Sequence, residues 1–237
     1  TRPSLAGVLH RERLFQALDR KRHSALVWIA GPAGAGKTTL AASYIDCRAP
    51  RSLWYQLDSA DTDIGTFFHY MALAALSPGI PCDEVLPNYP SEYQGSLGAF
   101  ARRFFRTLFA SVDESLVLVL DNYHELSWQS AFEEVLPVAV EELPPGSSIF
   151  VLSRTDPPAA LARARANRQI ELLGWNDLKL TRDEADAIVE RGGAPATDIY
   201  LQQLYRRTQG WAAGLILMLD QTSCRIDSRE LEDEPPQ

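Results

Sequence analysis

A glycine-rich loop followed by a lysine and two threonines carries the clearest chemistry in this sequence. Residues 31–38 read Gly-Pro-Ala-Gly-Ala-Gly-Lys-Thr and match the pattern G-x-x-x-x-G-K-[ST]. In this pattern small residues let consecutive backbone N–H groups converge on an anion, and the lysine reaches the outer phosphates. The Thr38 hydroxyl would hold Mg²⁺, because that ion prefers hard oxygen ligands. We therefore expect a nucleoside triphosphate with Mg²⁺ on this loop, in contact with Gly31, Pro32, Ala33, Gly34, Ala35, Gly36, Lys37, Thr38 and Thr39.

Asp121 is the second candidate for magnesium chemistry. It closes an unbroken apolar run, Leu-Val-Leu-Val-Leu at 116–120, which is typical of a parallel strand buried on both faces. A carboxylate at that end of a strand beside the phosphate loop can hold Mg²⁺ through its water shell. Capping of a helix near Ser127 is the alternative, although Ser127 can itself supply that cap.

The residue after this aspartate bears on the rate of hydrolysis. It is Asn122, whose amide can position a water molecule but cannot accept its proton near neutral pH. The sequence therefore predicts a weak ATPase suited to timing. Glu125 could replace the missing base, but nothing in the sequence fixes its direction, and a surface role is the alternative.

Arg154 is a candidate for reading the γ-phosphate. It follows the apolar run at 148–152, which predicts another buried strand, and Ser153. An arginine at this point would lie at the rim where the carboxyl ends of parallel strands form a ligand crevice. A surface ion pair is the alternative, because arginine often serves that purpose.

Alternating strands and helices would position these residues. Such alternation specifies an α/β fold with a parallel sheet, helices on both faces and right-handed crossovers, here a five-stranded sheet of the P-loop NTPase type. Apolar runs predict the strands at 25–30, 52–57, 115–121, 148–152 and 168–173. Helical periodicity predicts the helices at 8–21, 38–45, 64–76, 98–112 and 128–142, and a short helix after Pro157-Pro158.

Three aspartates after the second predicted strand, Asp58, Asp61 and Asp63, raise the question of a metal loop. They lack the glycine and the closing glutamate of a calcium-binding loop. Turn formation and helix capping are therefore the predicted roles.

The chain changes character after Gly174. Thr181 and Glu184 form a capping-box pattern before a helix that runs to about Glu190. Further helices are predicted at 197–207 and 211–222, which together make a small helical domain. We expect three parts: an α/β nucleotide-binding domain at 1–174, a helical domain at 175–225, and a disordered acidic tail or linker start at 226–237.

Composition limits the partners and the compartment. The formal charge of −8 argues against a broad nucleic-acid footprint on this piece, because phosphate neutralisation needs a basic face. Three widely spaced cysteines follow no disulfide or zinc pattern, and no signal peptide or membrane-spanning run is present. We expect a cytoplasmic protein without membrane contact. The chain begins with Thr1 and ends in an acidic tail, which suggests a fragment of something longer.

In their order along the chain, these features resemble the STAND class of signal-transduction ATPases, and within it the bacterial MalT-like, LuxR-type transcriptional activators. The resemblance covers nearly the whole chain, and the combination of Asp-x-Tyr-His with Gly-Trp-Ala-Ala-Gly-Leu is its most specific part. The segments that carry the resemblance are the phosphate loop and residues 8–14, 54–58 with Asp61 and Asp63, 118–124, 152–154 with Pro157-Pro158, and 209–215.

The resemblance implies an ATP/ADP switch. Proteins similar to this chain rest with ADP clamped between the α/β domain and the helical domains that follow it, and with ATP and an inducer they open and self-associate. It implies that Lys37 holds the β- and γ-phosphates, that Thr38 and Asp121 hold Mg²⁺, and that Arg154 reads the γ-phosphate. The inducer and DNA would be bound by domains outside this fragment.

Three further contacts to the nucleotide are implied by the resemblance. Leu9 and Arg11 match the segment that lies against the nucleotide upstream of the loop. Trp211 occupies the position from which relatives with a Gly-x-Pro motif touch the base or ribose. Core packing is the alternative for Trp211, because apolar residues at helical spacing follow it.

Two other functions remain open from the sequence. The first is a P-loop kinase for a small molecule, with Arg163, Arg165 and Arg168 as lid arginines over the transferred phosphate. The second is an interaction module that keeps its nucleotide locked without hydrolysis, which Asn122 would favour.

Overall fold

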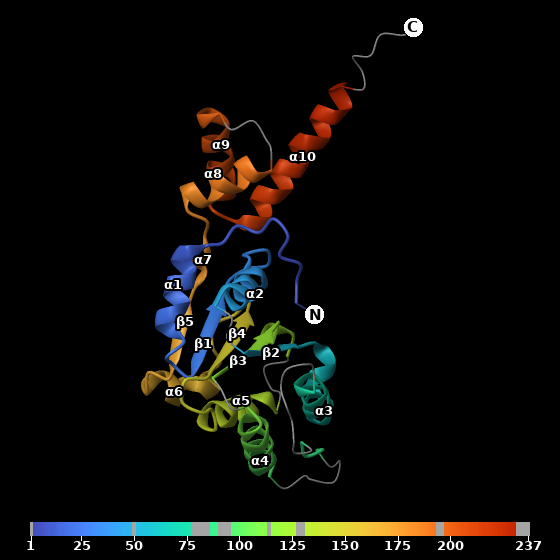
Figure 1. Cartoon of the computed structure of the whole chain (residues 1–237), viewed down its shortest axis with the longest axis vertical. Coiled ribbons are helices and arrows are strands. Elements are labelled where there is room, and N and C mark those ends of the chain that lie inside the picture. The colour runs from blue at the N-terminus through green and yellow to red at the C-terminus, as the bar shows by residue number, and fades with distance from the viewer. Residues whose placement is uncertain are drawn as a thin grey trace.

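The computed structural model describes residues 2–48, 51–76, 86–89, 96–112, 115–126, 131–192 and 197–230, with the backbone alone for 222–230. Ser127 and the last seven residues of the predicted tail lie outside this description. Figure 1 shows a central sheet covered by helices, with α8, α9 and α10 grouped at one end of the molecule.

The sheet has the five parallel strands that the sequence predicts. Its strand order is β2-β3-β4-β1-β5, so β1 lies inside the sheet between β4 and β5. Leu26 of β1 is in register with Ile149 on one side and with Ile170 on the other. The strands are β1 (Leu26–Ala30), β2 (Arg51–Gln56), β3 (Leu116–Asp121), β4 (Ser148–Ser153) and β5 (Ile170–Leu173).

The central strands are largely apolar because both faces of the sheet are covered, with polar residues only at the ends of β3 and β4. Every residue of β1, β3 and β4 is buried. Since successive side chains of a strand point to opposite faces, Leu26 and Trp28 enter one hydrophobic cluster while Val27 and Ile29 enter the other.

Helices fill the two layers around the sheet. One cluster joins the sheet to α1 and α2 through Phe15 and Tyr44, and the other joins it to α3, α4 and α5 through Phe68, Phe104 and Phe132. The helices are α1 (Glu12–Lys21), α2 (Lys37–Arg48), α3 (Ile64–Ala75), α4 (Leu97–Ala110), α5 (Phe132–Glu141) and α6 (Ala162–Ala166), with 3-10 turns η1 (Ser59–Thr62), η2 (Tyr123–Glu125) and η3 (Ala159–Leu161).

Several helix limits differ from the sequence prediction. The first helix begins at Glu12 and not at Val8, because the preceding residues leave the helical path and line a cavity described below. The second helix continues to Arg48, beyond the predicted end at Ile45.

The three aspartates after β2 act as caps, as predicted. Asp58 and Asp61 form a capping box at η1, and the Asp61 side chain is buried and accepts a hydrogen bond from Tyr55. Asp63 caps α3 by accepting from the Thr66 N–H.

The helices beyond the sheet have a hydrophobic cluster of their own. Leu180, Val189, Leu204 and Leu215 are among its buried members. The predicted capping box between Thr181 and Glu184 is present at the start of α8. The last helix continues to Glu230, beyond its predicted end at residue 222. The domain boundary at residue 174 stays a prediction. This part contains α7 (Trp175–Leu178), α8 (Arg182–Arg191), α9 (Asp198–Thr208) and α10 (Ala212–Glu230), of which α7 had no counterpart in the sequence prediction.

Candidate nucleotide-binding site

The phosphate loop connects the carboxyl end of β1 to the first turn of α2. Gly34 and Gly36 have φ angles of +69° and +81°, in the left-handed region that favours glycine. Helix α2 starts at Lys37, directly after the loop, so its free N–H groups lie where an anion would bind. Gly34, Gly36 and Thr39 line the cavity beside the loop, whereas Ala35 is buried in the core beneath it.

Lys37 is buried at the centre of the loop. Its Nζ donates hydrogen bonds to the carbonyl oxygens of Gly31, at 2.7 Å, and Pro32, at 2.9 Å. Burial, and then the positive charge of Arg154, lower the pKa of Lys37, while Asp121 opposes this shift. The buried Lys37 ammonium thus lies within the electrostatic influence of a second cation, the exposed Arg154, and an anion bound between them would relieve the repulsion.

Thr38 and Asp121, the two residues predicted to hold magnesium, are hydrogen-bonded to each other. Thr38 Oγ1 donates to Asp121 Oδ1 at 3.2 Å, and the Asn122 N–H donates to the same oxygen at 2.9 Å. Burial raises the pKa of Asp121, against the opposing effects of these hydrogen bonds and of Lys37. Hydroxyl and carboxylate oxygens at this spacing fit Mg²⁺ chemically. No cluster of three His, Cys, Asp or Glu ligands occurs in the described ranges, so a metal here would take most of its ligands from phosphates and water.

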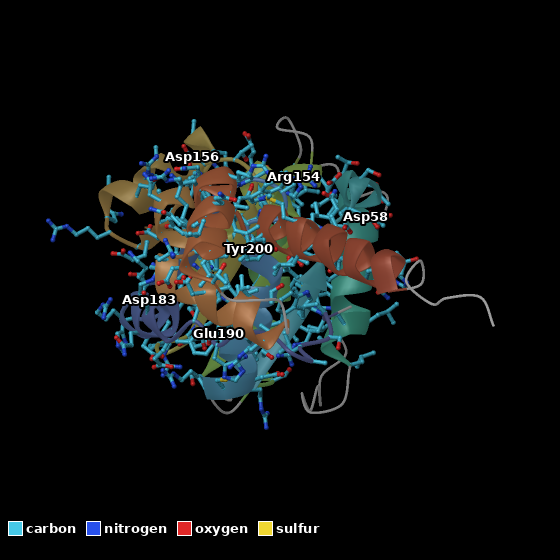
Figure 2. The ribbon with its side chains drawn as sticks, turned by 90° about the horizontal axis from the view of Figure 1, so that it is seen from above. Asp58, Arg154, Asp156, Asp183, Glu190 and Tyr200 are labelled. Atoms are coloured by element: carbon cyan, nitrogen blue, oxygen red, sulfur yellow. The ribbon has the colours of Figure 1, made fainter. Side chains whose placement is uncertain are left out.

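Arg154 follows β4 directly and is exposed. Its charge lowers the pKa of both Lys37 and His124, so it lies near the phosphate loop. Figure 2 shows Arg154 along one edge of the molecule near Asp156. Because β1, β3 and β4 are parallel, the residues that follow their carboxyl ends gather at one end of the sheet, as the sequence predicted.

His124 is a residue of this region that the sequence analysis did not single out. It lies on η2, three positions after Asp121, and its side chain is only 10% exposed. Neither ring nitrogen has a hydrogen-bond partner among the described residues, although Nε2 lies 3.3 Å from Glu125 Oε1 in an ion-pair contact. Its place at the end of the Asp-x-Tyr-His pattern was the signal available in the sequence.

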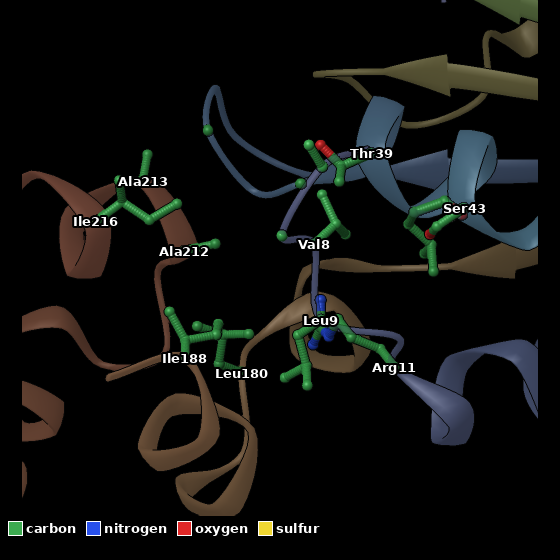
Figure 3. A pocket seen from close by; sticks show the side chains of 15 residues that line it. Val8, Leu9, Arg11, Thr39, Ser43, Leu180, Ile188, Ala212, Ala213 and Ile216 are labelled. Atoms are coloured by element: carbon green, nitrogen blue, oxygen red, sulfur yellow. Dashed lines mark hydrogen bonds between the residues drawn. The ribbon is translucent and has the colours of Figure 1, made fainter. Parts of the chain in front are cut away.

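A cavity of about 430 Å³ opens beside the phosphate loop. Figure 3 shows residues of α10 on one wall, Thr39 and Ser43 of α2 on the other, and Val8 between them. The lining is mostly apolar, and the volume falls within the about 300–1,000 Å³ of small-molecule sites. It is lined by Ala6, Gly7, Val8, Leu9, Arg11, Gly34, Gly36, Thr39, Leu40, Ser43, Leu180, Ile188, Ala212, Ala213 and Ile216.

Trp211 contacts the phosphate loop directly. Its Nε1 donates to the carbonyl oxygen of Ala33 at 2.9 Å, and two residues later the Ala213 N–H donates to the carbonyl oxygen of Gly34 at 3.1 Å. The indole is 38% exposed, so the alternative of simple core packing is wrong. The helical part is therefore hydrogen-bonded to the loop itself.

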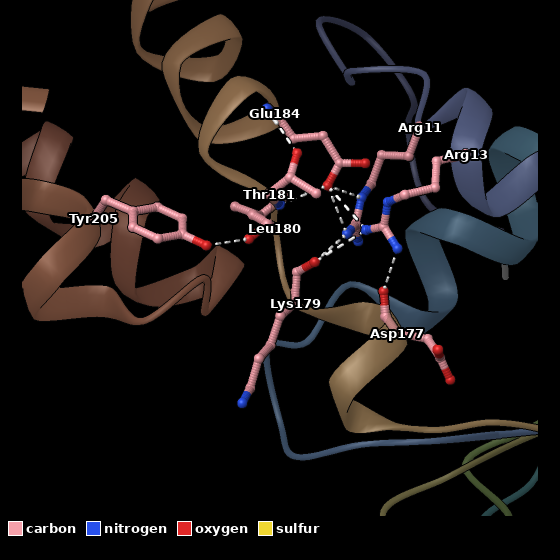
Figure 4. Close-up of polar contacts among 8 residues, drawn as sticks. All are labelled: Arg11, Arg13, Asp177, Lys179, Leu180, Thr181, Glu184 and Tyr205. Atoms are coloured by element: carbon pink, nitrogen blue, oxygen red, sulfur yellow. Dashed lines mark hydrogen bonds and ion pairs between the residues drawn. The ribbon is translucent and has the colours of Figure 1, made fainter. Parts of the chain in front are cut away.

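Arg11 reaches the cavity, but its guanidinium is directed at the helical part. It donates to the Glu184 carboxylate and to the Lys179 carbonyl oxygen, both at 2.9 Å from Nη2. Arg13 adds bonds to the carbonyl oxygens of Asp177 and Lys179 (Figure 4). Arg11 thus joins the segment before α1 to α8, a contact that the sequence did not reveal.

Residues 6–154, more than half of the chain, match the family model described as Nephrocystin 3, N-terminal. The chain belongs to this family. The matched range begins at the segment that lines the cavity and ends at Arg154, so it contains the phosphate loop, Asp121 and His124.

This member of the Nephrocystin 3, N-terminal family is also similar to bacterial transcriptional regulators. It is 30% identical over 216 residues to the HTH-type transcriptional regulator MalT of Yersinia enterocolitica, covering 90% of this chain and 24% of the relative. MalT of Yersinia pestis is 29% identical over the same coverage. The chain spans about a quarter of the length of these relatives. The predicted similarity to the NTPase region of MalT-like regulators is confirmed.

Solved structures share the fold of this family member. The RuvB Holliday junction branch migration motor of Thermotoga maritima aligns with a TM-score of 0.56 at 17% identity, covering 97% of this chain and 67% of that chain. A Walker-type ATPase of Pyrococcus abyssi gives 0.52 at 11% identity, covering 95% and 75%. These likenesses establish the P-loop NTPase fold, which implies nucleotide binding. Among the described residues no helix is long and apolar enough to span a membrane.

Proposed function

We propose that this chain is the ATP/ADP-binding switch of a longer, signal-responsive transcriptional activator. The observation that carries the proposal is the pair of hydrogen bonds from Trp211 Nε1 and the Ala213 N–H to the loop carbonyls of Ala33 and Gly34. Gain or loss of the terminal phosphate would change the geometry of the loop and would therefore alter these two hydrogen bonds. The helical part would therefore respond to the nucleotide state.

The phosphates would bind at the loop, where backbone N–H groups and Lys37 converge. Lys37 would turn from the carbonyl oxygens of Gly31 and Pro32 to the phosphate oxygens. The negative charge of the phosphates would then offset the repulsion between Lys37 and Arg154. The terminal phosphate would lie toward Arg154, on the side of β4.

The base and ribose would occupy the apolar cavity beside the loop. Leu9 and Val8 on one segment and Ile188 and Ile216 on the helical part provide apolar walls around it. A flat purine ring suits such a cleft, because it buries apolar area on both faces. The choice of adenine rests on the resemblance to the MalT-like regulators.

Magnesium would be held by Thr38 and Asp121 together with phosphate oxygens. When bound, the ion supplies charge neutralisation for the transferred phosphoryl group. Asn122 would orient the attacking water without taking its proton, which supports slow hydrolysis. Slow hydrolysis suits a timer, since the ATP state then persists long enough to be read.

The nucleotide would control self-association of the full-length protein in the cytoplasm. In the ADP state, the contacts of Trp211 and Arg11 would hold the helical part against the α/β part. In the ATP state, these contacts would open and expose surfaces for assembly. The inducer and DNA would bind elsewhere in the longer protein.

The kinase alternative loses its support. Arg163 and Arg165 are on α6, and Arg168 follows it, just before β5 begins. The amino end of a parallel strand lies opposite the end where the phosphate loop leaves β1, and Figure 1 shows α6 far from α8 and α10. These arginines are therefore at the wrong end of the sheet to serve as a lid.

Calorimetry with ADP and with ATP, each with Mg²⁺, tests the proposal. Both nucleotides are expected to bind, and Lys37→Ala is expected to weaken binding at least tenfold. Lys21→Ala, the same change on α1 away from the loop, serves as the control.

Single-turnover assay of bound ATP should give slow Mg²⁺-dependent ADP formation, whereas no ADP at all would favour the locked module. Absence of binding by either nucleotide would overturn the proposal.

A further inference from the structure

A second cavity lies at the β2 edge of the sheet. It has a volume of about 560 Å³ and is lined by residues of β2, η1 and α3. Strand β2 is the first in the sheet order, and among the described residues it pairs with β3 alone. Tyr70 and Leu73 of α3 line the cavity and are 54% and 48% exposed. Exposed apolar side chains beside an open strand edge indicate a surface that another chain can cover.

The wall of this cavity contains two carboxylates without a cation. Asp61 is buried and accepts hydrogen bonds from the Tyr55 hydroxyl, at 2.6 Å, and from the Asp58 N–H, at 2.9 Å. Asp58 is exposed and lines the cavity too. Within the described ranges neither aspartate forms an ion pair. Because buried carboxylates are normally paired with a cation, the cavity is suited to a positively charged side chain.

The opposite edge of the sheet, at β5, has the complementary properties. Arg163, Arg165 and Arg168 are exposed, and none of them forms an ion pair in the part of the chain that the structure describes. Helix α6, which carries the first two, contacts β5, where Leu172 is 43% exposed. Figure 1 shows α6 and β5 at one side of the molecule and α3 at the other. In a chain with a net charge of −8, this edge is a local basic surface.

We propose that the β2 edge of one copy of this chain binds the α6 arginines of a second copy, so that copies associate head to tail. The inference rests on the proposed function, which includes self-association, and it names the two surfaces that meet. A guanidinium enters the cavity, pairs with Asp58 and stacks on the Tyr70 ring. Arginine suits this position because its planar group binds carboxylates with two hydrogen bonds and stacks on aromatic rings. Leu172 of the second copy covers Leu73.

The contact is heterologous, because the two surfaces differ and lie at opposite edges of the sheet. Each copy in a pair therefore keeps one open surface and can bind a further copy. The β2 edge also borders the candidate magnesium site, since the Leu57 N–H donates to the Asp121 carbonyl oxygen at 2.8 Å. The nucleotide is for this reason kept the same in every arm of the test.

Sedimentation velocity over a series of chain concentrations, with Mg²⁺ and the non-hydrolysable β,γ-imido analogue of ATP, measures the association constant. Arg163→Gln/Arg165→Gln removes two cations and is expected to weaken association at least about tenfold. Leu73→Arg places a cation at the cavity, where it repels the incoming arginines, and should have an effect of similar size. Both changes are at exposed positions, and a cooperative thermal transition shows that each variant is folded.

Matched controls carry the same changes elsewhere. Arg206→Gln/Arg207→Gln on α9 removes two exposed arginines, and Leu217→Arg adds a cation at an exposed leucine of α10. Each control should keep the association constant within about twofold of wild type, because surface charges away from an interface act only weakly. Equal losses in the controls and in the test variants would show a general effect of charge and would overturn the proposal.

Mixing the two test variants examines the head-to-tail arrangement. Arg163→Gln/Arg165→Gln retains an intact cavity, and Leu73→Arg retains intact arginines. An equimolar mixture should therefore form a complex of two chains and nothing larger, whereas each variant alone stays monomeric. A mixture that stays monomeric would overturn the pairing of these two surfaces.

Calorimetry with the same analogue separates this inference from the proposed function. If the chain binds no nucleotide but the two test variants still weaken association, the proposed function fails and this inference stands. If the chain binds nucleotide and wild type is monomeric at every concentration, or the variants associate as wild type does, this inference fails and nucleotide binding stands. If the chain neither binds nucleotide nor associates, both fail.

Discussion

Arg11 and Glu184 are 173 positions apart in the sequence, yet Arg11 Nη2 lies 2.9 Å from Glu184 Oε2. Both side chains are nearly buried, and Arg13 reaches the same carboxylate at 3.2 Å. Glu184 also completes the capping box of α8 by accepting from the Thr181 N–H. One carboxylate therefore starts a helix and ties it to the segment before α1.

Glu184→Gln should destabilise the chain by about 1.5–3 kcal/mol, the range of hydrogen bonds to charged groups. The amide can still accept from the Thr181 N–H, but it removes the charge that faces Arg11 and Arg13. Urea unfolding measures the loss. Glu171→Gln, which breaks the more exposed pair with Lys21, is the control and should cost less than about 1 kcal/mol. Equal losses in the two variants would contradict the prediction.

The same pair predicts a pH dependence. Burial alone would raise the pKa of Glu184, but hydrogen bonds from Arg11, the Thr181 N–H and Arg13 outweigh it and lower the pKa. A carboxyl with a lower pKa in the folded chain stabilises the fold above its unfolded pKa, and that stability is lost as the pH falls through the folded pKa.

The difference in Tm between wild type and Glu184→Gln should therefore be full at neutral pH and shrink on acidification below about 4.3, the ordinary pKa of glutamate. Scanning calorimetry in a series of acidic buffers would follow it. A difference that persists undiminished at the lowest accessible pH would show that the charge of Glu184 is not its source.

Trp211→Phe should speed the release of ADP, because it removes the N–H that bonds to Ala33 and keeps a ring over Gly214. A neutral hydrogen bond contributes about 0.5–1.5 kcal/mol, so the dissociation rate should rise by about twofold to tenfold. Stopped-flow displacement of a fluorescent ADP measures it. Trp54→Phe is the matched control, since the Trp54 N–H has no partner among the described residues. Similar rates in the two variants would be evidence against the contact.

Gly34→Ala should prevent the helical part from docking on the loop. A Cβ at Gly34 would lie 2.4 Å from the Ala213 Cβ, and the φ of +69° adds about 1–2 kcal/mol of strain. Gly7→Ala, at φ +75° in open space, carries similar strain without the collision.

Adding Ala213→Gly to Gly34→Ala should recover part of the lost stability, because it removes the atom that collides. A double-mutant cycle by urea unfolding would therefore give a favourable coupling of about 0.5–3 kcal/mol between the two positions. Additive losses would mean that the two residues do not meet.

Asn122→Asp should accelerate hydrolysis, because it places a proton acceptor beside Asp121. General-base catalysis contributes about 10²–10⁴-fold when well aimed, and we expect at least a tenfold rise in the single-turnover rate. The backbone tolerates the change, since aspartate resembles asparagine in accepting the φ of +64° found here. Asn167→Asp, beyond α6, is the control. An unchanged rate would place the attacking water away from this side chain.

Much of this architecture could be predicted from the sequence, because it depends on local patterns. The apolar run before Asp121 is typical of a buried strand, and the spacing of Gly34, Gly36 and Lys37 between a strand and a helix is typical of a phosphate loop. The capping box of Thr181 and Glu184 is likewise local. The residues that determine each of these elements are close to one another in the sequence.

The remainder depends on contacts between distant residues. No periodicity could show that residues 8–11 turn away from the first helix, because the cavity they line is closed by α8 and α10. The helix α7 has four residues, too few for a repeat. His124 carries no sign in the sequence that its side chain is nearly buried, since that depends on how η2 packs against β4.

Because the five strands run in one direction, the residues of the candidate nucleotide site lie at the carboxyl ends of the strands, and the loop after α6 lies at the opposite end of the sheet. Asn167 is exposed at that end, and Ile199 on α9 is exposed in the helical part. Fluorophores attached to cysteines at these two positions, with the native Cys47, Cys82 and Cys224 replaced, would report the separation of the two parts by energy transfer. The sheet thus provides a fixed position from which the displacement of the helical part can be followed over time as a change in distance.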